Sequence, residues 1–157
     1  MSRYAEKTAV PVDKSKAEIE GVLARYGATS FASGWDGNRA MIQFEARGRR
    51  IRFILPLPSK TEKRFTHTPG RGLPRKPDES MREWEQACRQ SWRALALVVK
   101  AKLEAVAAGI TEFEDEFLAN IVMPDGLTVA DHVKPKIEIA YQQGDMPPML
   151  PNYGPRQ

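Results

Sequence analysis

Two runs of alternating apolar and polar residues, joined by a tight turn, constrain the fold of this chain most. Such period-two alternation is typical of strands with one buried face and one wet face. Arg47-Gly48 between the runs is a turn signal. Residues 39–46 and 49–55 therefore predict an antiparallel hairpin. Its inward side chains are Ala40, Ile42, Phe44, Ile51, Phe53 and Leu55.

A third strand is predicted just before this hairpin. Residues 28–35 contain Phe31 among small side chains, and the turn signal Asp36-Gly37-Asn38 follows them. Upstream, Ser15 and Glu18 have the spacing of a capping box, which predicts a helix ending near Gly27. The first third of the chain therefore predicts a helix followed by a three-stranded antiparallel meander.

The longest predicted element is a helix over residues 81–108, opened by a capping box of Ser80 and Glu83. A third capping box, Thr111 and Glu114, predicts a short helix, and a last helix is expected over 129–143, interrupted by Pro135. The seam of the long helix should be buried and should face Ile42, Phe44, Ile51 and Phe53. Its members are Trp84, Trp92, Leu95, Val99 and Leu103.

The fold class predicted from these elements is α+β, with a three-stranded antiparallel sheet packed on a long central helix and short helices at both ends. A length of 157 residues favours one domain. We expect residues 1–13 to form an extended arm and residues 145–157 a proline-rich tail. Residues 56–79 should form a basic loop rich in proline and glycine, without secondary structure, and 59–79 should be the most mobile internal segment.

The cellular setting predicted from the sequence is the cytoplasm. Cys88 is the single cysteine, which excludes an intrachain disulfide. The first residues lack the apolar core of a signal peptide, and no apolar run approaches the roughly 18–20 residues that span a bilayer.

Basic residues are concentrated in the middle of the chain. The net charge is +4, but residues 39–76 contain eleven basic and two acidic groups, while residues 77–157 contain eight basic and thirteen acidic groups. Segregation of this kind favours a surface that faces a polyanion. The alternative is a set of solvated charges that only keep the protein soluble.

Seven residues are predicted to form one basic surface that binds the nucleic-acid backbone. Arg50 and Arg52 share a strand face, and the planar guanidinium binds phosphate through two hydrogen bonds. In the basic loop, Phe65 is expected to be free to stack on a base. The seven are Arg47, Arg49, Arg50, Arg52, Lys63, Arg64 and Arg93. If they lie on unrelated faces instead, the charge would serve solubility, and a protein-interaction module would become the first hypothesis.

No catalytic residue, metal site or cofactor is predicted. His67 and His132 lack companions at metal-ligand spacing, and Cys88 lies on an apolar seam, where we expect an inert thiol. Trp35, beside a turn, is expected to be exposed and able to stack, whereas Trp84 and Trp92 are expected in the core.

Two resemblances bear on function. Residues 4–8, 51–58 and 84–95 resemble a family of small phage and prophage proteins without an assigned function, which implies a phage setting. The order of elements is similar to the β-β-β-α core of single-strand annealing proteins, including the phage recombinases. That resemblance implies a basic groove for single-stranded DNA between sheet and helix, and assembly into rings.

The function predicted first is non-catalytic, backbone-directed binding of nucleic acid, single-stranded DNA above all, in phage replication or recombination. The expected partners are nucleic acid, with a homo-oligomer or a host protein as further possibilities, and no membrane. An alternative is an interaction module that inhibits a host factor by presenting charged surfaces. A third hypothesis is a metal-dependent nuclease, which would need carboxylates converging from distant segments.

Overall fold

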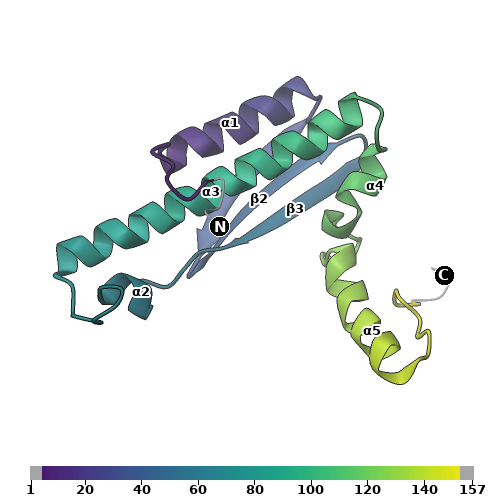
Figure 1. Ribbon diagram of the computed structural model, residues 1–157. Helices are drawn as coiled ribbons and strands as arrows, with labels where there is room; N and C mark the ends of the chain where they lie inside the picture. Colours follow the sequence, from purple (N-terminus) through teal and green to yellow (C-terminus); the bar gives the residue numbers. More distant parts are fainter. Residues whose placement is uncertain (1–4, 153–157) are drawn as a thin grey trace.

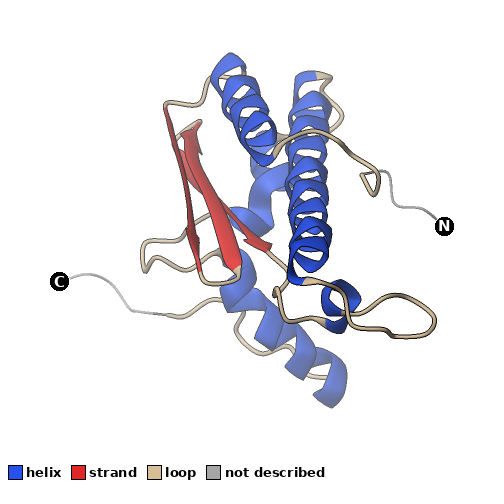
Figure 2. Cartoon of the chain, turned by 90° about the vertical axis from the view of Figure 1, so that its left-hand side faces the viewer, coloured by secondary structure: helices blue, strands red, loops and turns tan. Residues whose placement is uncertain are grey.

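The centre of the protein is a three-stranded antiparallel sheet with two helices on one face (Figures 1 and 2). The computed structural model describes residues 5–152. The strands β1 (Ser30–Asp36), β2 (Arg39–Ala46) and β3 (Arg49–Pro56) follow one another in chain order. The covering helices are α1 (Val12–Arg25) and α3 (Pro77–Ala107). The predicted α+β class is therefore confirmed.

The register of the strands places the predicted apolar side chains on the helix-covered face. Phe44 pairs with Phe31 on β1 and with Ile51 on β3, and Ile42 pairs with Phe53. Partners across antiparallel strands share a face, so these residues meet the seam of α3. The predicted burial is confirmed for four of the five seam residues, namely Trp92, Leu95, Val99 and Leu103.

Trp84 was predicted in the core, and this is wrong. Its side chain is half-buried and lies outside the core cluster, with the indole Nε1 donating to the Pro58 carbonyl at 2.8 Å. The 31 residues of α3 make it about 46 Å long. The eight-residue strand β3 reaches only about 26 Å. The first turns of α3 therefore overhang the sheet, and Trp84 lies on this overhang.

The other end of the core is closed by α4 (Phe113–Phe117) and a 3₁₀ turn, η1 (Leu118–Asn120). Phe117 is completely buried, and its ring meets those of Phe44 and Phe53 edge-on, at centroid distances of 5.8 and 6.2 Å. Beyond η1, the Val122 amide donates to the Arg50 carbonyl at 2.8 Å. The chain after α4 therefore also covers part of the outer edge of β3.

The three capping boxes predicted at Ser15, Ser80 and Thr111 are wrong. The N-caps of α1, α3 and α4 are Pro11, Lys76 and Glu112, and none of them makes a side-chain cap hydrogen bond. Proline sets the backbone angle that a helix start needs, and it precedes α1 and opens α3. Ser15 consequently lies inside α1, where it is buried.

The described part of the chain does contain a capping box, at the start of α5 (Val129–Gln143). Thr128 Oγ1 accepts from the Asp131 amide at 3.2 Å, and Asp131 Oδ2 accepts from the Thr128 amide at 2.9 Å. Pro135 lies within α5 and does not interrupt it, contrary to the prediction.

Replacing Thr128 with alanine should destabilise α5 by about 1 kcal/mol. Hydrogen exchange of the α5 amides measures this loss, and Thr111→Ala, which removes no cap, is the matched control.

The Thr128 backbone amide holds the pKa of Asp131 below its ordinary value. The stabilisation from this carboxylate is therefore present above pH 3.8 and lost as the pH falls through the lowered pKa. Equal protection of α5 in both variants would contradict the capping role.

Residues 56–79 were predicted to lack secondary structure, and this too is wrong. They include a short helix, α2 (Lys63–Thr66), and a β-bridge between His67 and Pro74. Phe65 is buried, at 4% exposure, and so is not free to stack as predicted. This one apolar side chain anchors a segment whose composition suggested only a loop. The mobility of residues 59–79 stays a prediction.

The predicted extended arm is wrong at two places, because residues 5–7 form a turn and residues 12–13 belong to α1. Residues 5–11 lie against α3, where Gln86 Nε2 donates to the Thr8 carbonyl at 2.8 Å and Ala5 is buried. Residues 145–152 form neither helix nor strand. Residues 1–4 and 153–157 of the predicted arm and tail lie outside the described residues. Among residues 5–152, no helix is both long and apolar enough to cross a membrane.

Candidate nucleic-acid interface

The seven residues predicted to form one basic surface lie in three separate places. Four arginines lie on β3 and the turn before it. Lys63 and Arg64 lie on α2, at the opposite end of α3 from α4 (Figure 1). Arg93 points from α3 toward α1, where it pairs with Glu18. The prediction of a single surface is therefore wrong.

The arginines of the hairpin have partners within the protein. Arg49 pairs with Glu114 at 3.0 Å and Arg50 with Glu45 at 2.8 Å. Arg52 Nη1 donates to the Gly126 carbonyl at 2.8 Å. The guanidinium of Arg47 lies over the Phe113 ring at 5.6 Å. Arg50 and Arg52 do share the open sheet face, as predicted, but the contacts of the four arginines connect the hairpin internally and to the segment that follows α3.

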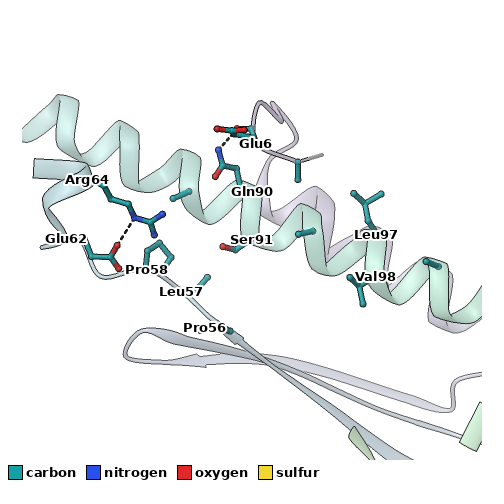
Figure 3. A pocket seen from close by; sticks show the side chains of 14 residues that line it. Glu6, Pro56, Leu57, Pro58, Glu62, Arg64, Gln90, Ser91, Leu97 and Val98 are labelled. Atoms are coloured by element: carbon teal, nitrogen blue, oxygen red, sulfur yellow. Dashed lines mark hydrogen bonds and ion pairs between the residues drawn. The ribbon is translucent and has the colours of Figure 1, made fainter. Parts of the chain in front are cut away.

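Arg64 lines a mostly apolar hollow of about 880 Å³ between α3 and the end of β3. Figure 3 shows it beside Glu62, to which its Nε donates at 2.6 Å. Arg64 is the single cation among the described residues that line this hollow, against the two carboxylates Glu6 and Glu62, and none of those residues is aromatic. The hollow therefore suits neither phosphates nor stacked bases.

A second hollow, of about 1070 Å³, has the opposite character. It is lined by all three tryptophans of the chain, Trp35, Trp84 and Trp92. Its cationic lining consists of Lys7, Lys16, Lys60 and Arg89, with Glu85 as the one carboxylate among its described lining residues. The net charge of the lining is therefore three positive. We call this hollow the tryptophan groove.

Four parts of the chain build the tryptophan groove. Trp35 comes from the end of β1, just before the turn to β2, and is 78% exposed. Trp84 and Trp92 come from α3, two turns apart, with Trp84 on the overhang and Trp92 at the edge of the core. The N-terminal segment with α1 and the linker after β3 complete the walls.

The lysines of the groove lie close to its aromatic rings. Lys60 Nζ is 4.5 Å from the centroid of Trp84, and Lys16 Nζ is 4.9 Å from that of Trp92. Arg89 is oriented by Gln86 Oε1, which accepts from its Nε at 2.9 Å and its Nη2 at 2.7 Å. Cations over ring faces form cation–π contacts. The groove thus presents aromatic and cationic groups side by side.

Part of this groove was visible in the sequence. The expected exposure of Trp35 is confirmed. Lys7 and Lys16, however, belong to a segment whose charges sum to zero, so the charge distribution along the chain did not indicate them. In the sequence, the signal for the overhang was that the long predicted helix, residues 81–108, is much longer than the predicted strands.

Cys88 lies in the wall of the groove and is buried, as predicted from the apolar seam. Burial raises the pKa of its thiol above the ordinary value of 9.0. Because the thiolate is the nucleophile, alkylation of the folded protein by iodoacetamide at pH 8 should be slower than after unfolding in urea. The rate should rise as the pH approaches the raised pKa. Equal rates for the folded and unfolded protein would contradict a protected thiol.

The histidines have local partners. His67 Nδ1 lies 2.8 Å from Thr66 Oγ1, and His132 Nε2 lies 2.7 Å from Asp125 Oδ2. Within residues 5–152, no three His, Cys, Asp or Glu side chains come together in a way that could hold a metal ion.

Comparison with known proteins assigns no family to this chain. A scan against protein-family models and searches of curated proteins and of solved structures give no match, so the geometry of the tryptophan groove is the basis of the functional argument.

Proposed function

We propose that the protein binds single-stranded nucleic acid, DNA above all, in the tryptophan groove, without catalysing a reaction. The observation that carries this proposal is the convergence of three tryptophans and four cationic side chains in one hollow. These groups come from segments distant in the sequence. They supply the two kinds of contact that sequence-independent binding of single strands uses, base stacking and phosphate neutralisation.

The chemistry of the groove favours a single strand over a duplex. Unpaired bases expose ring faces that can stack on Trp35, which is 78% exposed, and on the accessible parts of Trp84. In a duplex these faces are covered by neighbouring base pairs. Lys7, Lys16 and Lys60 would neutralise phosphates between the stacked bases. The setting in phage replication or recombination is part of this proposal and comes from the sequence resemblance.

The arginines of the hairpin have a different role in this proposal. Arg49 and Arg50 are paired with carboxylates, so they contribute to solubility and to holding the hairpin in place. Because they lie apart from Lys63, Arg64 and Arg93, the predicted single basic surface no longer supports nucleic-acid binding. The tryptophan groove supplies an independent one.

Fluorescence anisotropy of a labelled oligo(dT) titrated with the protein tests the proposal. Binding should be detectable at low salt and should weaken as salt is added, because each neutralised phosphate releases condensed counterions. A duplex of the same length should bind less tightly. A protein that binds no single strand at low salt would end the proposal.

Replacing Lys16 and Lys60 together with glutamine should weaken the complex with oligo(dT). Two lost phosphate contacts should lower the slope of log K against log salt by about 1.4 for a single strand. The matched control is Lys100→Gln with Lys134→Gln, which removes the same charge from exposed positions outside the groove. Equal slopes for the two double variants would show that the groove lysines do not contact phosphate.

A second candidate function, a protein-interaction module that inhibits a host factor, is favoured by α5. None of its residues is buried, and Ile137 and Tyr141 are 43% and 88% exposed. An apolar helix surface of this kind is typical of a protein contact. Tyr141→Ala should weaken capture of a protein partner and leave oligo(dT) binding unchanged, whereas a groove variant should do the reverse.

A further inference from the structure

Among residues 5–152, the outer edge of β1 is open along its whole length. Of the seven residues of the strand, six are exposed, and Phe31 alone is half-buried. Within residues 5–152, no backbone hydrogen bond joins the strand to any segment besides β2. By contrast, the opposite edge of the sheet, on β3, receives the Val122 amide and the Asn120 side-chain amide.

This open edge lacks the features that keep strands from pairing with other strands. Natural edge strands are protected by lysines, prolines, bulges or covering segments. β1 has the sequence Ser-Phe-Ala-Ser-Gly-Trp-Asp, in which the one charge, Asp36, is the last residue. All seven residues pair in unbroken register with β2, so the strand contains no bulge. The edge is therefore ready to accept another strand.

We propose that two copies of the protein pair through β1, antiparallel and centred on Ser33, to form one continuous six-stranded sheet. An antiparallel edge is complementary to a second copy of itself around a twofold axis. Ser33 is the middle residue of β1. With the twofold axis at Ser33, every residue of β1 pairs with a residue of β1 in the other copy.

This register places compatible side chains opposite one another. On the helix-covered face, Phe31 of one copy lies opposite Trp35 of the other, a favourable aromatic cross-strand pair. On the open face, Ala32 lies opposite Gly34, so neither side chain obstructs the pairing. At the ends, Ser30 lies opposite Asp36. In this arrangement the ring of Trp35, which is 78% exposed in one copy, gains a neighbour on the side away from β2.

The dimer does not rest on the proposed function, but it shares one residue, Trp35, with the tryptophan groove. A twofold axis perpendicular to a continuous sheet keeps the helices of both copies on the same face. Each groove contains Trp35 from β1, so both grooves would lie on that face, flanking the new strand pair.

Sedimentation equilibrium of wild type and two lysine variants tests the dimer. Ser33→Lys places two like charges directly opposite each other, so the dissociation constant of the dimer should rise by up to about fivefold. Ser30→Lys makes the same chemical change on the same exposed strand, but the lysine would face Asp36 of the other copy. That variant should remain as dimeric as wild type. A wild-type protein that stays monomeric at high concentration, or equal dimerisation of both variants, would overturn the proposal.

Disulfide trapping provides a second measurement, in which the substitution stabilises the dimer covalently and does not weaken it. In a Cys88→Ala background, Ser33→Cys should form a covalent dimer on mild oxidation, because directly opposed residues bring their Cβ atoms close to disulfide range. Ser30→Cys in the same background should not, since it faces Asp36. Cross-linking of Ser30→Cys without Ser33→Cys would show a different register and overturn the centring on Ser33.

Discussion

Replacing Phe117 with alanine should lower the free energy of unfolding by about 3–5 kcal/mol, the largest stability loss that we expect from a single substitution. Its side chain is completely buried and meets the rings of Phe44, Phe53 and Phe113. Truncation removes these contacts and leaves a cavity where α4 closes the core. Urea unfolding followed by circular dichroism measures the change.

The neighbouring substitution Leu118→Ala is the control for Phe117→Ala. Leu118 is 49% exposed, so its truncation should change stability by about 0.5 kcal/mol or less. Equal losses for the two variants would show that α4 does not close the core. A loss confined to Phe117→Ala would confirm that a five-residue helix supplies a main part of the core.

Replacing Trp35 with alanine should weaken the binding of oligo(dT) by about 1–3 kcal/mol, which corresponds to roughly 5- to 150-fold in affinity. The expected loss is that of one stacked base. Because Trp35 is 78% exposed, the folded protein should retain its stability.

Tyr141→Ala is the matched control for Trp35→Ala. Tyr141 is an aromatic residue on α5, 88% exposed and outside the tryptophan groove. Its removal should leave the affinity for oligo(dT) unchanged. If both variants bind as tightly as wild type, Trp35 does not stack on a base. If both lose affinity equally, the contact is not specific to the groove.

The sheet was predictable from the sequence because a period-two pattern and turn residues are local signals. Ile42, Phe44, Ile51 and Phe53 are buried where the alternation placed them. Helix starts were less predictable, since the spacing of a serine or threonine and a glutamate also occurs inside helices. Ser15 is an example, because the helix begins earlier, after Pro11.

The candidate site depended on information that a sequence does not contain. The sequence shows the arginines of β3 but not their partners. Arg49, for example, pairs with Glu114, which comes from a helix distant in the sequence. The tryptophan groove was missed for a different reason, because the signal for it was present in the lengths of the predicted helix and strands but was not used. Trp84 was expected in the core because its helical spacing matches that of Trp92, and only the lengths of α3 and the strands show that it lies beyond the sheet.

Intrinsic tryptophan fluorescence, recorded while unlabelled oligo(dT) is added to the wild-type protein, tests the central claim most directly. Trp35 is 78% exposed and Trp84 is half-buried in the groove, so a strand bound there must change the environment of these two rings, whereas Trp92 is buried. The account predicts saturable quenching, which is reversed by salt at the same concentrations that release a labelled oligonucleotide. Tryptophan emission that stays constant while anisotropy reports binding would place the nucleic acid elsewhere and contradict the groove as the binding site.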